Sequence, residues 1–402
     1  MVPARPAAAT SGPAVLGLVA DDLTGAGDAA VGFAEAGWTA LLSVRPSRLS
    51  STARPGPTVL AVTTGSRALP DDEAAARTAQ AVAAVVAAGA ERLYLKIDST
   101  VRGSVAGQVD GALAAWSVVH PDARAVICPA FPAHLRTVVD GQALVAGVPL
   151  GASAAAHDPV TPRTSGDLAQ VFPGTFRRPA ADPVDVSGPP GSRLLVDAHG
   201  DPDLDQLARG LDAAGPAVVM VGSGGLAAAL GRRWAQPDPL AVTASVDGRV
   251  LVAVSSLHPA TTAQLQQLRT GPSASVVEVL TTGAETTSPA AAAAELARRV
   301  RAALAGGRYD ALVAVGGDGA AAILAELAAD GIEIVGAVVP GCPTGYVSGG
   351  YADGLRLVTR SGGFGSAAAL DQIIRRLRTT RAGLPTDHHL QAGPRPSPKE
   401  AP

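Results

Sequence analysis

The chain has 402 residues, of which 47% are hydrophobic, so it is long enough to form two or three domains with substantial cores. Its formal net charge is -3 and only 3% of its residues are aromatic, which argues against a nucleic acid or an anionic membrane as its partner. A small molecule is therefore the expected partner.

The two cysteines, Cys128 and Cys342, stand far apart in the sequence. They are too few for a four-ligand zinc site or a disulfide framework, and they fit a reducing, cytoplasmic setting. No segment has the apolar length of a secretory signal or of a membrane span. We therefore expect a cytoplasmic protein, and we interpret residues 1–12 and 382–402 as disordered tails.

The first predicted strand, Val15 to Ala20, ends abruptly at two acidic residues, Asp21 and Asp22. Apolar residues with helical spacing follow them, which predicts a strand, an acidic turn and a helix. Ligands of open parallel sheets bind beyond the carboxyl ends of the strands, so the acidic pair occupies a position suited to function. A structural alternative is that Asp22 caps the helix and Asp21 is solvated.

The next two predicted strands, residues 58–64 and 93–97, also end in polar residues. Ser66 and Arg67 follow the first of them. At the end of the second begins an octet, Lys96 to Gly103, with the sequence K-I-D-S-T-V-R-G. This octet places two cations, a carboxylate and two hydroxyl groups in one strand-to-helix turn.

The octet has the composition needed to hold a polyhydroxy acid. Arg102 can fork onto a carboxylate, Lys96 supplies a point charge, and Asp98 and Ser99 can hydrogen-bond to hydroxyl groups. Lys96 is also one of only two lysines among 32 Lys and Arg residues. The structural alternative is an ion pair between Lys96 and Asp98, with Ser99 as the cap of the next helix.

Later strands of the same half are predicted at residues 125–128, 194–196 and 218–221. Residues 129–137 are predicted as a Pro-bounded loop, and residues 148–190 as an irregular excursion that covers the site. A second α/β series begins after a boundary near residues 239–248. We therefore predict an α/β protein with two α/β domains, mainly parallel sheets and an active-site cleft between the domains.

Three glycine-bearing turns follow predicted strands of the second series. The strands at 312–315, 332–339 and 355–359 lead to Gly316-Gly317-Asp318-Gly319, to 340–346 and to Ser361-Gly362-Gly363-Phe364-Gly365, while the strand at 250–254 leads to Ser255 and Ser256. Backbone amides that no side chain covers can approach phosphate oxygens, so these turns together predict a nucleotide-binding rim. The P-loop pattern and a G-x-G-x-x-G after the first strand are both absent from the sequence.

With these segments in order, the chain resembles the four-carbon acid sugar kinase family, ATP-dependent enzymes that phosphorylate the 4-hydroxyl group of threonate, erythronate or 3-oxo-tetronate. The resemblance covers nearly the whole ordered chain and is most specific in A-D-D-L-T-G-A at 20–26, K-I-D-S-T-V-R-G at 96–103 and S-G-G-F-G at 361–365. It implies that an N-terminal domain, 13–239, binds the sugar acid and that a C-terminal domain, 248–381, binds ATP with Mg²⁺.

The resemblance also implies the residues of the site. The sugar-acid pocket is implied to contain Asp21, Asp22, Arg67, Lys96, Asp98, Ser99 and Arg102. The nucleotide is implied to contact Ser256, Gly316, Gly317, Asp318, Gly319 and Gly362 or Gly363. The chain departs from the family pattern at four positions, where Ser255 replaces a glycine, Gly319 a hydroxyl residue, Arg360 a lysine and Gly27 a threonine.

Phosphoryl transfer needs an anchor for the substrate, a base near the attacking hydroxyl group and positive charge around the γ-phosphate. We assign Arg102 and Lys96 to the anchor and Asp22, or else Asp21, to the base. The other acid of the pair is expected to hold magnesium through water. Closure of the two domains is expected to exclude water from the reaction.

Two other interpretations stay open. The turn Gly316-Gly317-Asp318-Gly319 resembles the G-G-D-G turn of NAD kinase and diacylglycerol kinase relatives, which predicts a different kinase. The departures at Ser255, Gly319 and Arg360 favour a catalytically weak protein that binds a sugar acid as a sensor or partner. The stereoisomer and oxidation state of the acid stay open too, as does the oligomeric state, with a homodimer among the alternatives.

Overall fold

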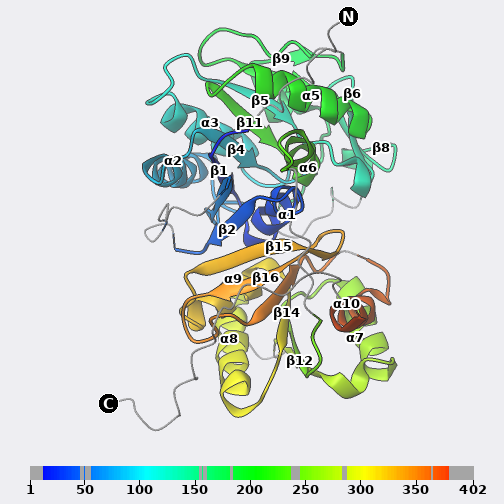
Figure 1. Cartoon of the computed structure of the whole chain (residues 1–402). Coiled ribbons are helices and arrows are strands. Elements are labelled where there is room, and N and C mark those ends of the chain that lie inside the picture. The colour runs from blue at the N-terminus through cyan, green and yellow to red at the C-terminus, as the bar shows by residue number, and fades with distance from the viewer. Residues whose placement is uncertain are drawn as a thin grey trace, which may run out of the picture.

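The computed structural model describes residues 12–45, 49, 56–153, 156, 161–181, 184–236, 245–282, 288–363 and 365–379. Its strands form one 14-stranded, mainly parallel sheet that runs through both halves of the chain (Figure 1). The strand order across this sheet is β13-β12-β14-β17-β16-β15-β2-β3-β1-β4-β11-β5-β10-β9. No helix in the described ranges is both long and apolar enough to cross a membrane.

The eight strands of the N-terminal half that belong to the large sheet are all parallel. They are β1 (Val15–Ala20), β2 (Thr39–Ser43), β3 (Thr58–Thr63), β4 (Arg92–Lys96), β5 (Arg124–Cys128), β9 (Thr175–Arg178), β10 (Arg193–Val196) and β11 (Val218–Gly222). The helices of this half are α1 (Leu23–Ala34), α2 (Asp71–Ala87), α3 (Val105–Trp116), α4 (Leu168–Val171), α5 (Asp201–Ala213) and α6 (Gly224–Arg233). A separate small sheet contains β6 (Arg136–Val139), β7 (Gln142–Val145) and β8 (Val148–Pro149).

The C-terminal half repeats the α/β pattern. Its strands are β12 (Val250–Val254), β13 (Val277–Thr281), β14 (Ala311–Val315), β15 (Gly331–Val339), β16 (Cys342–Ser348) and β17 (Arg356–Arg360). Its helices are α7 (Pro259–Thr270), α8 (Pro289–Gly306), α9 (Gly317–Glu326) and α10 (Ala369–Thr379). The prediction of a mainly parallel α/β fold is thus confirmed, and β1 and β12 have the predicted bounds.

The two halves are joined strand to strand, which the sequence did not predict. β15 pairs antiparallel with the short strand β2, in a register that places Gly331 opposite Ser43 and Ile334 opposite Ala40. Most of the predicted domain boundary near residues 239–248 lies outside the described ranges. Most of the two predicted tails, residues 1–11 and 380–402, also lies outside them.

Two predicted loops are partly strands. The loop predicted at 340–346 is a two-residue turn, Pro340-Gly341, followed by β16, and Gly341 adopts a φ of +75°, as glycine does after proline in a type II turn. Pro343 lies within this central strand, where a register irregularity between Ala337 and Val339 accommodates it. The loop predicted at 129–137 likewise continues into β6.

Helix α1 is held in place by an aromatic cluster. The ring of Phe33 lies 5.7 Å from that of Trp38 and 6.3 Å from that of Trp234, which ends α6. Gly32 and Gly231 bring α1 and α6 so close that a Cβ at Gly231 would meet the carbonyl of Gly32. This packing fixes the helix whose first turn follows the acidic pair.

Candidate active site

Asp21 and Asp22, at the end of β1, share the guanidinium group of Arg67. Arg67 donates from Nε to Asp21 Oδ2 over 2.6 Å and from Nη2 to Asp21 Oδ1 over 3.0 Å, while its Nη1 lies 2.9 Å from Asp22 Oδ2. Asp21 is 1% exposed. Burial raises the pKa of Asp21 although Arg67 opposes this shift. The predicted acidic turn is therefore a buried, charge-paired cluster.

Asp22 is the N-cap of α1, so the structural alternative holds for this residue. Its Oδ1 accepts a hydrogen bond from the amide of Gly25 over 2.8 Å, and its Oδ2 accepts one from the hydroxyl of Thr24 over 2.8 Å. Burial would raise the pKa of Asp22, but the charges of Arg67 and Lys96 outweigh it and lower that pKa. Asp22 therefore stays ionised, with both oxygens engaged.

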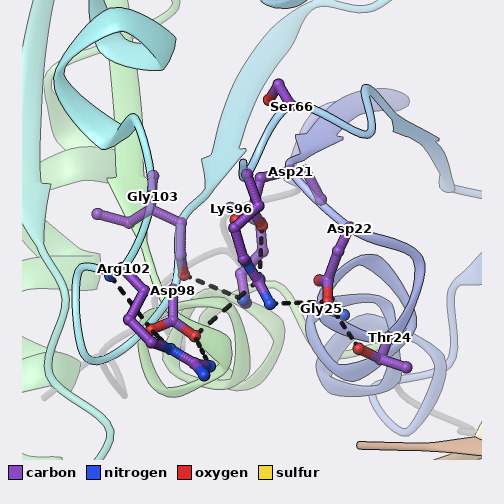
Figure 2. Close-up of polar contacts among 12 residues, drawn as sticks. Asp21, Asp22, Thr24, Gly25, Ser66, Lys96, Asp98, Arg102 and Gly103 are labelled. Carbon is purple, nitrogen blue, oxygen red and sulfur yellow. Dashed lines mark hydrogen bonds and ion pairs between the residues drawn. The ribbon is translucent and has the colours of Figure 1, made fainter. Parts of the chain in front are cut away.

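The octet turn is organised around Asp98 (Figure 2). Its carboxylate accepts hydrogen bonds from Nε and Nη2 of Arg102 over 2.9 and 2.8 Å, and from the hydroxyl of Thr100 over 2.5 Å. Burial opposes ionisation, but Arg102, Arg67 and Thr100 hold the pKa of Asp98 well below its ordinary value. The Lys96–Asp98 pair of the structural alternative does not form in the described part of the chain. Ser104, not Ser99, is the N-cap residue of α3, and its hydroxyl donates to the carbonyl of Leu69 rather than capping the helix.

The backbone of the octet turn is strained. Val101 is fully buried and has a φ of +49°, which is a real outlier for a β-branched residue. Gly103 has a φ of +76°, and a Cβ there would meet the carbonyl of Arg67. Strain of this kind is concentrated at functional sites, where the surrounding structure enforces it. Gly103 thereby ties the octet turn to the turn that carries Arg67.

Lys96 lies between these two charged groups. It is 5% exposed, its Nζ donates to the carbonyl of Ile97 over 3.0 Å, and this Nζ is 3.0 Å from where a Cβ of Gly25 would stand. Ser99 is half-buried in the octet turn. All seven residues of the predicted sugar-acid pocket thus come from the ends of β1, β3 and β4, which are neighbours in the sheet.

The turn between β14 and α9, in the C-terminal half, lies against Asp22 and Thr24. A Cβ at Gly317 would lie 3.6 Å from Oδ2 of Asp22 and 3.6 Å from the hydroxyl oxygen of Thr24. Gly316, the N-cap of α9, has a φ of +109° and provides no side-chain cap. The first amides of α9 therefore lie uncapped beside Asp22, an arrangement that suits an anion.

The remaining nucleotide residues form a second contact group. A Cβ at Gly362 would overlap Ser256 Oγ, and the hydroxyl of Thr261 donates to the carbonyl of Gly362 over 2.8 Å. A Cβ at Gly363 would lie 3.4 Å from the His258 ring. A Cβ at Gly316 would lie 3.2 Å from the Ser256 amide, which links the two groups. Phe364 of the predicted motif lies outside the described residues.

Two departures from the family pattern occupy the same space. A Cβ at Gly319 would lie 2.5 Å from Ser255 Cβ and would also overlap Ser255 Oγ. The Ser255 hydroxyl donates to the Val315 carbonyl over 3.2 Å. A third departure, Arg360, is 1% exposed and donates to Gln264 Oε1 over 2.9 Å, so it holds the Ser361 turn against α7.

Two residues near the site were not singled out from the sequence. Asp28, on α1, has its pKa raised to about 6 by burial, with Asp22 adding to the shift and Lys96 opposing it. Arg163, in the predicted excursion, donates from Nη2 to the carbonyl of Gly103 over 2.6 Å, as expected for a segment that covers the site. The sequence could have indicated Asp28, because it is an acid within an otherwise apolar helix. No feature of the sequence marks Arg163.

The described residues include no group of three or more His, Cys, Asp and Glu side chains that could hold a metal ion. The oxygens of Asp21 and Asp22 are already engaged by Arg67, Thr24 and Gly25. These described residues therefore offer no cage for a resident Mg²⁺. Magnesium commonly reaches kinase sites on the substrate phosphates, with one or two carboxylates added.

Replacing Asp98 with asparagine is expected to lower the free energy of unfolding by about 1.5–3 kcal/mol, because Arg102 and Thr100 lose a charged acceptor. The pKa of Asp98 is depressed in the folded state, so its contribution is present above the unfolded pKa and is lost only in stronger acid. The difference should therefore stay constant from pH 5 to 8 in urea unfolding. Asp72→Asn, at an exposed site on α2, is the control, with an expected change within about 0.5 kcal/mol.

Comparison with known proteins places this geometry in a family. Residues 16–230 match the family model of a sugar-binding N-terminal domain, and residues 282–370 match that of a nucleotide-binding C-terminal domain. A D-threonate kinase of Bordetella bronchiseptica is 38% identical over 91% of this chain and 98% of its own length. A D-threonate kinase of Salmonella typhimurium is 28% identical over 88% and 96%.

Solved structures agree on the fold. A Bordetella bronchiseptica protein, crystallised with bound citrate as a domain-swapped dimer, is 36% identical, with a TM-score of 0.50 over 92% of this chain and 100% of that one. A Salmonella typhimurium protein is 20% identical, with a TM-score of 0.72 over 91% and 99%. On the family models and the full-length relatives together, the chain belongs to the four-carbon acid sugar kinase family.

Proposed function

We propose that this protein is an ATP-dependent kinase that phosphorylates the 4-hydroxyl group of threonate, erythronate or 3-oxo-tetronate. The observation that carries the proposal is that Gly317, in the Gly316–Gly319 turn, lies next to Asp22 and Thr24. A phosphate at the uncapped start of α9 would lie beside the carboxylates and the octet turn. Phosphoryl transfer depends mainly on such positioning and on charge neutralisation.

Five cations gather around the octet turn and suit an anionic substrate: Arg67, Lys96, Arg102, Arg136 and Arg163. The acids whose charges act on them are Asp21, Asp22, Asp28, Asp71 and Asp98. Lys96 and Arg102 are the proposed anchor for the substrate carboxylate, and Asp98 and Ser99 the contacts for its hydroxyl groups. The citrate bound to the Bordetella bronchiseptica protein, itself a hydroxy acid, supports this substrate class.

On the nucleotide side, the proposed contacts are those predicted from the sequence: Ser256, Gly316, Gly317, Asp318, Gly319, Gly362 and Gly363. Mg·ATP enters as a substrate, with its magnesium on the phosphates. Asp22 and Asp21, to which the sequence assigned the base, are proposed to hold Arg67 and the first turn of α1 beside the substrates. Closure of the two halves around the substrates, a cytoplasmic location and a homodimer belong to the same proposal.

An ADP-release assay with D- and L-threonate, D- and L-erythronate and their 3-oxo forms tests the proposal. Turnover is expected with at least one of these acids and Mg·ATP, and it should fall at least about 100-fold in Lys96→Met, because the anchor charge is lost. No turnover on any of them would contradict the proposal. Calorimetry then separates the alternatives, since a sensor would bind a sugar acid but not Mg·ATP, and an NAD kinase-like enzyme would phosphorylate NAD.

A further inference from the structure

Asp28 lies on α1, where the two halves of the chain meet. The proposed function assigns it no role. Its Oδ2 lies against Gly224, at the start of α6 in the N-terminal half. Its charge acts on Cys342, in β16 of the C-terminal half. Gly27, the residue before Asp28, faces Pro343 of the same strand. A Cβ at Gly27 would lie 3.0 Å from the Pro343 ring. Asp28 therefore lies at the junction of the sugar-acid and nucleotide halves.

The three acids of the predicted sugar-acid pocket have both carboxylate oxygens engaged. Asp21 is bound by Arg67, Asp22 by Gly25 and Thr24, and Asp98 by Arg102. Asp28, by contrast, accepts no hydrogen bond from any residue in the described ranges. Asp28 is half-buried, so its carboxylate keeps acceptor positions that a molecule entering from solvent can reach. A hydroxyl group of a bound substrate would supply the missing donor.

We propose that Asp28, rather than the Asp21–Asp22 pair, takes up the proton of the attacking hydroxyl group, an inference that rests on the proposed function. The hydroxyl oxygen forms a bond to the γ-phosphorus of ATP. The bond from this phosphorus to the β–γ bridging oxygen breaks, and its electron pair leaves with ADP. The hydroxyl proton goes to the Asp28 carboxylate and is then released to water. Asp22 and Asp21 position Arg67 and the first turn of α1.

The surroundings of Asp28 suit a proton acceptor at neutral pH. The titratable groups that face it are Lys96 and Tyr94 on β4, Cys342 on β16 and Asp22 on its own helix. Burial raises the pKa of Tyr94 well above its ordinary value and that of Cys342 to about 11, so both stay neutral. A carboxyl with a pKa of about 6 is mostly ionised at pH 7–8 and still basic enough to accept a proton.

The test compares Asp28→Asn with Asp22→Asn. Asp28→Asn is expected to lower kcat by about 100- to 10,000-fold while calorimetry shows sugar-acid and Mg·ATP affinities within about threefold of the wild type. In the wild type, kcat/KM should fall below a pH of about 6, and this acid limb should be absent from the residual activity of Asp28→Asn but present in Asp22→Asn. Asp28→Glu, which keeps the carboxyl, should recover part of kcat, and exposed Asp72→Asn is the control.

Thermal unfolding separates this role from a structural one. Burial of the ionised carboxylate is unfavourable in the folded state, so the Tm of Asp28→Asn at pH 8 should equal or exceed that of the wild type. A lower Tm with parallel losses in both affinities would indicate a structural role and overturn the proposal. Turnover of Asp28→Asn within a few-fold of the wild type would overturn it as well, as would loss of the acid limb in Asp22→Asn alone. If wild-type protein turns over none of the acids, the proposed function fails first.

Discussion

Replacing Arg67 with methionine should lower the free energy of unfolding by about 3–5 kcal/mol at pH 8 and abolish turnover. The methionine side chain fills much of the same space but leaves Asp21, 1% exposed, without the guanidinium that binds both of its oxygens. Removing one partner of a buried ion pair is costly because the remaining charge has lost both water and its counterion. Asp22 loses the same partner at 2.9 Å.

The loss should shrink as the pH falls. Burial raises the pKa of Asp21 even with Arg67 in place, and it would rise further in Arg67→Met. A carboxyl with a folded pKa above its unfolded value destabilises the protein most when ionised, so the variant gains stability as the pH falls through the folded pKa. Urea unfolding at pH 8 and pH 5 should show this recovery.

Arg67→Lys is the matched control, because it keeps the charge but not the two-pronged geometry, and it should lose less than Arg67→Met. Asp98→Asn provides a contrast, since its effect should not depend on pH over the same range. The prediction is wrong if Arg67→Met lowers the free energy of unfolding by less than about 1 kcal/mol, or by the same amount at pH 8 and pH 5. Either result would show that Arg67 does not stabilise the ionised form of Asp21.

Local patterns predicted most of the fold. Val15–Ala20 and Val250–Val254 are apolar runs bounded by turn residues, and buried parallel strands have this appearance in any context. β2 and β16 were missed because pairing, not composition, makes them strands. β2 alternates half-buried and buried residues over only five positions, and β16 contains a proline and a glycine that read as a turn. Their partners lie in β3, β15 and β17, which local propensity cannot identify.

The sequence predicted which residues come together in the octet turn, but not which of them form ion pairs. The octet brings Lys96, Asp98 and Arg102 together by sequence alone, yet the partner of Asp98 is set by a backbone turn in which Val101 has a φ of +49°. Sequence reasoning has no access to such a conformation, so it weighed Lys96 as the partner instead. The role of Asp28 depends on residues from β4, α6 and β16, which only the folded chain brings together.

The pair Ser255 and Gly319 shows why single departures from a pattern mislead. Each alone suggests a weakened nucleotide site. In the structure, however, the Ser255 side chain fills the space that a side chain at residue 319 would need, 2.5 Å from Ser255 Cβ. Residue 255 follows β12 and residue 319 lies in the first turn of α9, so the two positions exclude each other sterically. The Ser255 hydroxyl group therefore occupies the place that a side chain at residue 319 would take.

An exchange of the two side chains tests this interpretation. Gly319→Ser alone should weaken Mg·ATP binding roughly 100-fold, about 3 kcal/mol, because the new side chain collides with Ser255 and displaces the turn that the phosphates approach. Ser255→Gly alone should cost about 1 kcal/mol, since it removes the hydrogen bond to Val315 and adds backbone freedom. The double variant should bind Mg·ATP within about threefold of the wild type.

Calorimetric titration with Mg·ATP measures all four proteins, and thermal unfolding confirms that each is folded. The steric interpretation requires that the effects of the two substitutions on Mg·ATP affinity are not additive, because the two side chains compete for one space. The double variant must therefore bind Mg·ATP much more tightly than Gly319→Ser, whereas additive effects would make it bind more weakly. If the losses simply add, or if Gly319→Ser binds Mg·ATP as the wild type does, the two positions do not compete. Recovery in the double variant would place the hydroxyl, from either residue, among the determinants of nucleotide binding.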